Sequence, residues 1–337
     1  MILEDGGKSF LRVNLVWKLV ILFVAGVLGV YLFLSRADHG LSYHSLRLDP
    51  LLQAWRKEDF CPQRFAKLEF AQHYPRPKTY SRGECACTPV HNFVILSTQR
   101  SGSGWFETLL NSHPNITSHG EIFSVRPRRH NFSIVSHTLD ALYNLDWHNS
   151  ASKNSCTSVV GFKWMLNQGA MEYRSEVSSY FKRRGVSVIL LIRRNGLKRL
   201  ISILANAYDR RQPMNGTHVS HVHSEEAADL LASYKPTVDV AFLKNNLDRY
   251  DLMIKNALCA FEGTRLLVIY YEDFVKNRKE MQRTVQEFLS VPVMRLRSRQ
   301  WKIHRGPLSQ SVTNWKEVFR ELNGTSYQGF LADDDYS

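Results

Sequence analysis

Acidic residues are few in this 337-residue chain: 31 Asp and Glu stand against 44 Lys and Arg, which leaves a net charge of +13. This shortage of negative charge implies an anionic partner, such as a nucleotide, an acidic glycan, a nucleic acid or a lipid head group. The charge alone does not choose among them. Hydrophobic residues make up 44% of the chain, which excludes disorder over most of its length and predicts one large folded domain with appendages.

Cysteine is also scarce, with five residues: Cys61, Cys85, Cys87, Cys156 and Cys259. No second Cys or His pair stands at metal-ligand spacing around Cys85 and Cys87, so a zinc site is disfavoured. An oxidising compartment, with up to two disulfides and one remaining thiol, fits this number better.

No small-residue cleavage site follows the long apolar run of residues 19–34, which favours a retained membrane anchor over a removed signal peptide. With the apolar residues before it, the run covers residues 15–34, about 20 residues, enough to cross a bilayer as a helix. Basic residues are denser before the run than directly after it, so we expect residues 1–14 to be a cytosolic tail. The rest of the chain would be luminal or extracellular. Four N-x-S/T sequons agree, at Asn115, Asn131, Asn215 and Asn323.

The chain shows no internal repeat and divides by composition into three parts after the anchor. Residues 35–89 are interpreted as a stem, residues 90–331 as the main folded domain and residues 332–337 as an acidic tail. Apolar runs in the domain predict strands at 92–98, 158–164, 186–193 and 264–271. Helical patterns cover 103–112, 169–184, 196–208, 236–260 and 273–289. Because the strand runs are continuously apolar, they predict a three-layer α/β domain with a mainly parallel sheet.

The Walker pattern G-x-x-x-x-G-K-[ST] is absent, so polyphosphate transfer with magnesium is disfavoured. Instead, a turn of small residues joins the first predicted strand to the first helix. Free amides and hydroxyls there, with close approach of the backbone, suit a phosphate or sulfate group. The candidate ligands are Thr98, Gln99, Arg100, Ser101, Gly102, Ser103, Gly104 and Trp105. The alternative is a serine-capped helix start that needs no ligand.

A second group of candidates follows the predicted strand over 186–193. Arg193 and Arg194 stand at its end, and Ser202 lies two turns into the next helix. Basic residues at a helix start oppose the local dipole and therefore favour a bound anion. Ligands of parallel sheets gather beyond the carboxyl ends of the strands. We therefore expect two cationic pockets at one edge of the sheet, suited to a ligand phosphorylated at two separated points.

These features resemble the sulfotransferases that use 3′-phosphoadenosine 5′-phosphosulfate (PAPS), specifically the carbohydrate sulfotransferases of the nodulation-factor type and their membrane-anchored plant relatives. The resemblance covers roughly residues 90–331. Residues 98–105 look like the 5′-phosphosulfate loop, and Arg194 with Ser202 looks like the 3′-phosphate site. Further matches are residues 161–168, residues 271–274, and Asn314-Trp315 followed by Leu322 and Tyr327.

Two departures from this family pattern affect the predicted site. Many Golgi carbohydrate sulfotransferases carry a second Ser or Thr where Gly104 stands, so one contact to the sulfuryl oxygens is weakened. They also carry Asp-Pro where this chain has Asn195-Gly196. That change leaves open whether Arg193 or Arg194 is the main 3′-phosphate ligand, although the spacing to Ser202 favours Arg194.

The resemblance implies a P-loop-like fold, PAPS as co-substrate, no metal, no nucleic-acid partner, and a type II location in the Golgi membrane with a luminal catalytic domain. It places the general base at Glu121, in a segment that follows the first predicted helix. The alternatives are His119 as the base, oriented by Glu121, and a solvated loop carboxylate without a catalytic role. Arg100 would stabilise charge on the leaving phosphate. Lys163 either bridges donor and acceptor or caps a strand facing water.

The predicted function is transfer of a sulfuryl group to a hydroxyl of a carbohydrate or glycoconjugate by in-line displacement. A nucleotide-dependent kinase and an inactive luminal glycan-binding protein are the alternatives. The loop over 208–223, with its three histidines, is interpreted as a lid facing the acceptor, not as a metal site. Lys302, His304 and Arg305 are expected in a loop that closes over the donor. Acceptor identity and oligomeric state are not encoded in any motif.

Overall fold

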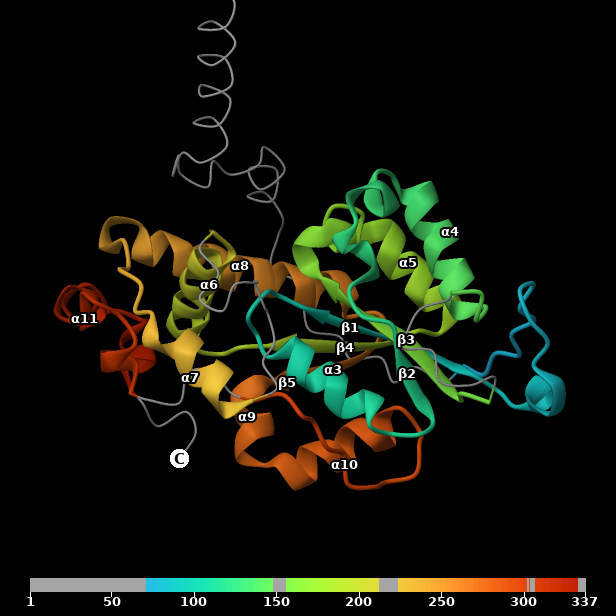
Figure 1. Cartoon of the computed structure of the whole chain (residues 1–337). Helices are drawn as coiled ribbons and strands as arrows, with labels where there is room; N and C mark the ends of the chain where they lie inside the picture. The colour runs from blue at the N-terminus through green and yellow to red at the C-terminus, as the bar shows by residue number, and fades with distance from the viewer. Residues whose placement is uncertain (1–70, 148–155, 212–223, 302, 304–306, 333–337) are drawn as a thin grey trace, which may run out of the picture. The chain divides into compact units, whose positions relative to one another are not determined.

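A parallel sheet lies at the centre of the described part of the chain (Figure 1). The structure is a computed structural model and describes residues 71–147, 156–211, 224–301, 303 and 307–332. The strands are β1 (His91–Ser97), β2 (Ile116–Ser118), β3 (Val159–Met165), β4 (Ser187–Ile192) and β5 (Arg265–Tyr270). They pair in the order β2-β3-β1-β4-β5, and every pairing is parallel. The predicted parallel α/β sheet is confirmed.

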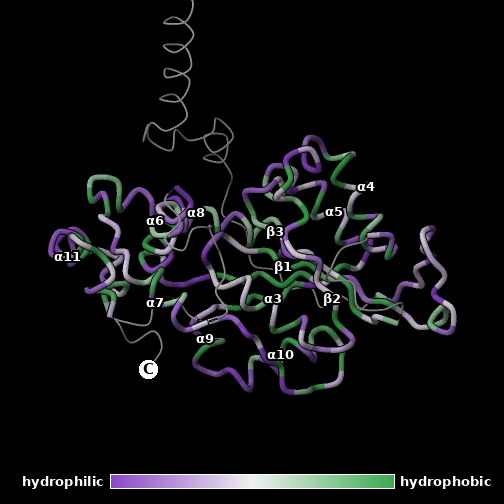
Figure 2. Tube along the Cα trace, viewed as in Figure 1, coloured by the Kyte–Doolittle hydropathy of each residue, from purple (hydrophilic) through white to green (hydrophobic). Residues whose placement is uncertain are grey.

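Helices cover both faces of this sheet, which explains why its central strands are apolar throughout. The helices are α3 (Ser103–Asn111), α4 (Phe132–Tyr143), α5 (Arg174–Arg184), α6 (Gly196–Arg211), α7 (Glu225–Ser233), α8 (Leu243–Phe261), α9 (Tyr271–Lys276), α10 (Arg278–Phe288) and α11 (Trp315–Leu322). Alternate strand residues face opposite layers. Ile95 of β1 packs with α3 and α10, whereas Phe162 and Trp164 of β3 contact aromatic rings of α4 and α5. Figure 2 shows the hydrophobic residues concentrated along β1 and β3.

The four predicted strands each lie within one residue of their expected bounds. Three predicted helices are shorter or divided. The helix expected from residue 169 begins only at Arg174, because Gln168 and Gly169 have non-helical dihedral angles. The helix expected from residue 236 begins at Leu243. The helix expected over 273–289 is divided at Asn277 into α9 and α10. The sequence patterns did not predict β2, α4, α7 or α11.

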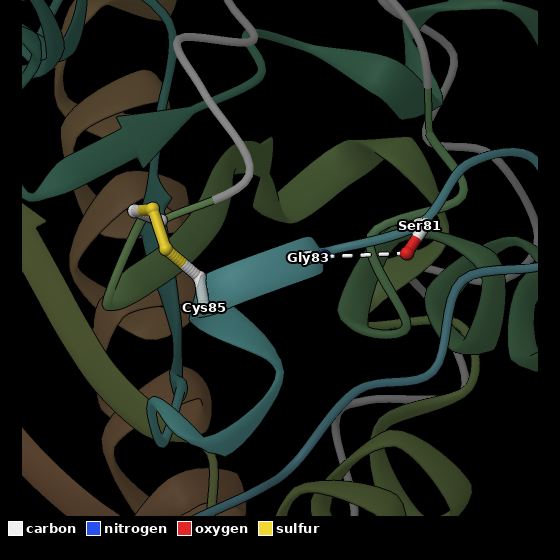
Figure 3. The surroundings of a disulfide bond; sticks show 4 residues. Ser81, Gly83 and Cys85 are labelled. Carbon is white, nitrogen blue, oxygen red and sulfur yellow. Dashed lines mark hydrogen bonds between the residues drawn. A yellow bond between two sulfur atoms is a disulfide. The ribbon is translucent and has the colours of Figure 1, made fainter.

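The segment before β1 is attached to the domain by backbone pairing and by a disulfide. His73 and Val90 form an isolated antiparallel bridge. Cys85 is bonded to Cys156, which lies shortly before β3. Figure 3 shows this bond beside the 3-10 helix Gly83–Cys87, where the Gly83 amide donates a hydrogen bond to Ser81 Oγ over 3.2 Å. Cys87 and Cys259 are exposed thiols, and Cys61 lies outside the described residues.

None of the helices in the described ranges combines the length and the hydrophobicity that a membrane span requires. The predicted anchor, residues 15–34, lies outside those ranges, as do the tail of residues 1–14 and most of the predicted stem. The anchor and its orientation therefore stay predictions.

Candidate functional site

The predicted anion loop lies between β1 and α3, at the carboxyl edge of the sheet. Its backbone passes through two left-handed residues, Arg100 (φ 64°) and Gly102 (φ 80°). A Cβ at Gly102 would collide with the ring of Tyr271, so the position has no room for a side chain. Thr98 and Ser101 are buried, and their hydroxyl oxygens hydrogen-bond over 2.7 Å. The loop thus has a defined shape, with glycine where the backbone must approach its neighbour closely.

The end of the predicted loop belongs to α3. Ser103 and Gly104 are buried in the first turn of this helix, where backbone amides have no acceptor within the helix. The Trp105 ring makes edge contacts with the rings of Tyr271 and Phe274, at centroid distances of 5.9 and 5.3 Å. Trp105 therefore packs α3 against α9, a structural role that its position in the motif did not indicate.

Arg100 of the loop forms a cluster with two arginines from the segment after β4, Arg193 and Arg199. Arg100 Nε donates to Ser202 Oγ over 2.8 Å, and Arg193 Nη1 donates to the carbonyl of Arg100 over 3.2 Å. Arg199 Nε lies 3.0 Å from both Thr98 Oγ1 and the carbonyl of Gln99. Burial, together with the nearby charge of Arg193, lowers the pKa of Arg100 to about 10. A buried cationic cluster of this kind favours a bound anion.

Burial likewise lowers the pKa of Arg199 to about 10; the neighbouring Tyr250 raises it, and the charge of Arg193 lowers it further. The guanidinium of Arg199 lies 4.3 Å from the centroid of the Tyr250 ring. Tyr250 in turn donates from its hydroxyl to the carbonyl of Arg193 over 2.7 Å. The pKa values of about 10 leave Arg100 and Arg199 charged at neutral pH.

Arg194 lies apart from this cluster. Its guanidinium donates two hydrogen bonds of 2.8 Å to the carboxylate of Asp273 and lies 4.2 Å from the centroid of the Tyr270 ring. The hydrogen bonds that Arg194 donates to Asp273 raise the pKa of Arg194. The structure therefore pairs Ser202 with Arg100, whereas the sequence pairs it with Arg194. Successive residues beyond an extended strand project in opposite directions, which explains why Arg193 faces the loop while Arg194 does not.

The predicted base lies on a turn that follows β2 at the same edge of the sheet. Glu121 Oε1 lies 3.3 Å from Lys163 Nζ, and Gln168 Nε2 donates to Glu121 Oε2 over 3.0 Å. The Glu121 side chain is 33% exposed, so an acceptor can reach it, whereas the Lys163 side chain is 6% exposed. Lys163 is thus a buried ammonium beside Glu121 and does not cap a strand facing water. His119 is buried next to this turn.

Several residues at this carboxyl edge of the sheet were not predicted from the sequence. Arg199 and Asn206 lie on the same face of α6 as Ser202, at helical spacings of three and four residues, which was a usable signal. Arg100 Nη1 donates to Asn206 Oδ1 over 3.5 Å. Gln99 Nε2 donates to Asn167 Oδ1 over 2.6 Å and so joins the anion loop to the turn after β3. Only the folded chain shows that link.

The remaining candidate residues, in the predicted lid and in the predicted loop over the donor, lie outside the described residues. His218, His221 and His223 are not described, and neither are Lys302, His304 and Arg305. Within the described residues, no group of three or more His, Cys, Asp or Glu could hold a metal ion.

Comparison with known proteins gives sequence relatives but no family model: no model matches the chain. Nodulation protein H of Rhizobium meliloti is 27% identical over 258 residues, covering 73% of this chain and 98% of the relative. Nodulation protein H of Rhizobium tropici is 28% identical over 249 residues, covering 73% of this chain and 94% of the relative. This similarity agrees with the resemblance that the motifs indicate.

Two solved structures are similar to part of this chain, at low sequence identity and low TM-score. A sulfotransferase from Alicyclobacillus acidocaldarius has 14% identity and a TM-score of 0.37, covering 63% of this chain and 86% of that one. Mouse sulfotransferase SULT7A1, solved in complex with PAP, has 15% identity and a TM-score of 0.36, covering 60% of each chain.

Proposed function

We propose that this chain is a PAPS-dependent sulfotransferase, related to the nodulation-factor enzymes and their membrane-anchored plant relatives. It transfers a sulfuryl group to a hydroxyl of a carbohydrate or glycoconjugate. One observation carries the proposal: buried arginines and a partly exposed carboxylate paired with a buried lysine lie at the same carboxyl edge of one parallel sheet. Anion binding and proton removal are the two tasks that sulfuryl transfer requires of the protein.

The residues around the anion loop fit a doubly phosphorylated adenosine compound. Gly102 allows the loop to pack against the Tyr271 ring, and the first turn of α3 offers amides that have no acceptor within the helix. Arg100 and the loop amides would bind the 5′-phosphosulfate end, and Ser202 with Arg193 or Arg194 would bind the 3′-phosphate. When bound, PAPS supplies the sulfuryl group. For Arg194 to take part, its guanidinium must leave Asp273.

On the acceptor side, Glu121 takes the proton of the attacking hydroxyl. Its carboxylate is held at both oxygens, by Lys163 and by Gln168, yet remains partly exposed. A positioned base of this kind contributes on the order of 10²–10⁴-fold to rate. Lys163 would bridge donor and acceptor, and burial would strengthen its interaction with negative charge there.

A transfer assay tests this proposal directly. The full-length chain, purified in detergent, is incubated with PAPS carrying radioactive sulfate and with a panel of glycans, without added metal. We expect label to appear on at least one glycan, and calorimetry to show binding of adenosine 3′,5′-bisphosphate. A chain that binds ATP and transfers phosphate with magnesium would be a kinase. A chain that retains sulfated glycans but does not bind the bisphosphate would be a binding protein. Either result overturns the proposal.

The location of the enzyme is a further part of the proposal. Residues 15–34 would anchor it in the Golgi membrane as a single-pass type II protein, with residues 1–14 in the cytosol and the catalytic domain in the lumen. Four sequons and the disulfide between Cys85 and Cys156 support an oxidising, glycosylating compartment. Glycosidase sensitivity of the full-length protein in intact microsomes checks this orientation, since only luminal sequons become glycosylated.

A further inference from the structure

Glu107 is a buried carboxylate in the middle of α3 that the proposed mechanism does not use. It is 7% exposed, and both of its oxygens are occupied. Oε1 accepts hydrogen bonds from the Ser118 hydroxyl over 2.6 Å and from the Gly120 amide over 2.9 Å. Oε2 lies 3.2 Å from Lys163 Nζ. Burying a charge is costly unless it is paired and hydrogen-bonded. The three contacts to Glu107 therefore indicate that the surrounding residues stabilise its buried carboxylate.

All the partners of Glu107 belong to the acceptor side of the site. Ser118 is the last residue of β2, and Gly120 directly precedes Glu121 in the turn that follows. Lys163 lies between two carboxylates, at 3.2 Å from Glu107 and 3.3 Å from Glu121. Since α3 begins in the anion loop, Glu107 connects the helix that starts at the donor side to the turn that holds the base.

We propose that Glu107 is a positioning residue for the base Glu121; this inference rests on the proposed function. It holds the turn after β2 through Ser118 and Gly120, which fixes the place of Glu121. It also shares the charge of Lys163, so that Glu121 is not the sole counter-ion of this buried ammonium. Without Glu107, Lys163 would pair with Glu121 alone and occupy the lone pair that must accept the proton.

The first test is Glu107→Gln in the full-length chain. The amide keeps the size of the side chain and one acceptor oxygen, but it removes the charge that faces Lys163. We expect kcat for sulfuryl transfer to fall roughly 10- to 100-fold, less than the roughly 10²–10⁴-fold that a general base contributes, because Glu121 itself is still present. The affinity for adenosine 3′,5′-bisphosphate should stay within about twofold, because the partners of Glu107 lie on the acceptor side. Glu107→Asp, which restores the charge, should recover part of the rate.

The second test asks whether Glu107 acts through Lys163. Lys163→Met removes the shared charge, and the double variant completes a thermodynamic cycle. We expect Glu107→Gln to cost much less in the Lys163→Met background than in the wild type. Fully additive losses, an unchanged kcat in Glu107→Gln, or an equal loss of bisphosphate affinity and kcat would each overturn the proposal.

A third measurement needs no turnover and separates this proposal from the proposed function. Hydrogen exchange of the amides in residues 118–122 should become faster in Glu107→Gln, while exchange in residues 97–102 stays unchanged. The matched control is Asp140→Asn, which removes a carboxylate that accepts from Tyr180 and Arg184 on the far side of the sheet. It should change neither kcat nor exchange in residues 118–122. If the wild type transfers no sulfuryl group, the proposed function fails, and the exchange result still decides whether Glu107 holds the turn.

Discussion

The donor and acceptor sides of the candidate site differ in charge and in the way they are held. On the donor side, Arg100, Arg193 and Arg199 lie around one loop and are fixed by hydroxyl and carbonyl oxygens. On the acceptor side, Lys163 lies between two carboxylates. The first arrangement is positive before any ligand binds, and the second carries a net negative charge. This difference is the basis on which the proposed function gives anion binding to one side and proton transfer to the other.

The largest expected effect separates the two sides through Glu121. Glu121→Gln keeps the shape of the side chain but removes its ability to take a proton. We expect kcat to fall about 10²–10⁴-fold, with unchanged affinity for adenosine 3′,5′-bisphosphate. Steady-state kinetics and calorimetry on the same preparation measure both quantities. Full activity of this variant would move the role of base to another residue, with His119 the next candidate.

The converse experiment is Arg100→Ala on the donor side. Arg100 is the buried cation of the anion loop, so its removal should weaken bisphosphate binding and reduce transfer about 10²–10³-fold. Arg283→Ala is the control, because Arg283 is an exposed arginine of α10 that pairs with Glu280 and Glu287 on the same helix. Bisphosphate affinity equal to wild type in Arg100→Ala would show that the loop does not bind the donor.

A smaller effect tests where Arg194 belongs in this comparison. Hydrogen bonds from Arg194 hold the pKa of Asp273 below its ordinary value, so the pair is charged at neutral pH. Asp273→Asn weakens the hold on Arg194. If Arg194 binds the 3′-phosphate, bisphosphate affinity should rise by a few fold, in the range of a partly exposed ion pair. Unchanged affinity in both Asp273→Asn and Arg194→Ala would assign the phosphate to Arg193.

The smallest expected effect concerns His73 and His91, near the start of β1 and at the opposite end of the sheet from the candidate site. Burial lowers the pKa values of His73 and His91, so their neutral forms are favoured in the folded chain. The unfolded chain takes up protons at these positions near pH 6.5, and stability should therefore be constant above that pH and decline below it. Denaturant unfolding between pH 7.5 and 5 measures the decline. His91→Gln should flatten the curve, and an equally steep curve in that variant would contradict this origin.

The strands and the anion loop were predictable because their signals are local. Continuous apolar runs identified β1, β3, β4 and β5, and a turn of small residues between strand and helix identified the loop. Strand β2 was not predicted, because its three residues are too few to show a pattern of apolar residues. Helix α4 has an asparagine N-cap at Asn131. This capping signal is present in the sequence, but Asn131 was interpreted only as part of a sequon.

The contacts within the site depended on the fold. Nothing in the sequence around Glu107 indicates that its carboxylate reaches Lys163, which is 56 positions away and on another element. Ser202 was correctly placed near an arginine at this edge, but the structure joins it to Arg100 and leaves Arg194 with Asp273. Such pairings follow from the direction in which each side chain leaves its strand or helix, and spacing along the chain does not determine that direction.

The covalent link between Cys85 and Cys156 closes a loop of the chain that contains part of the candidate site, whereas Lys163, Arg193, Arg199 and Ser202 follow Cys156. The anion loop, α3, the turn with Glu121 and α4 all lie between these two cysteines, which are 71 positions apart. Closing a loop of that length lowers the entropy of the unfolded chain and stabilises the fold by about 4 kcal/mol. Reducing agents should therefore lower the free energy of unfolding of the whole domain, so the candidate site should be less stable in a reduced preparation than with the disulfide intact.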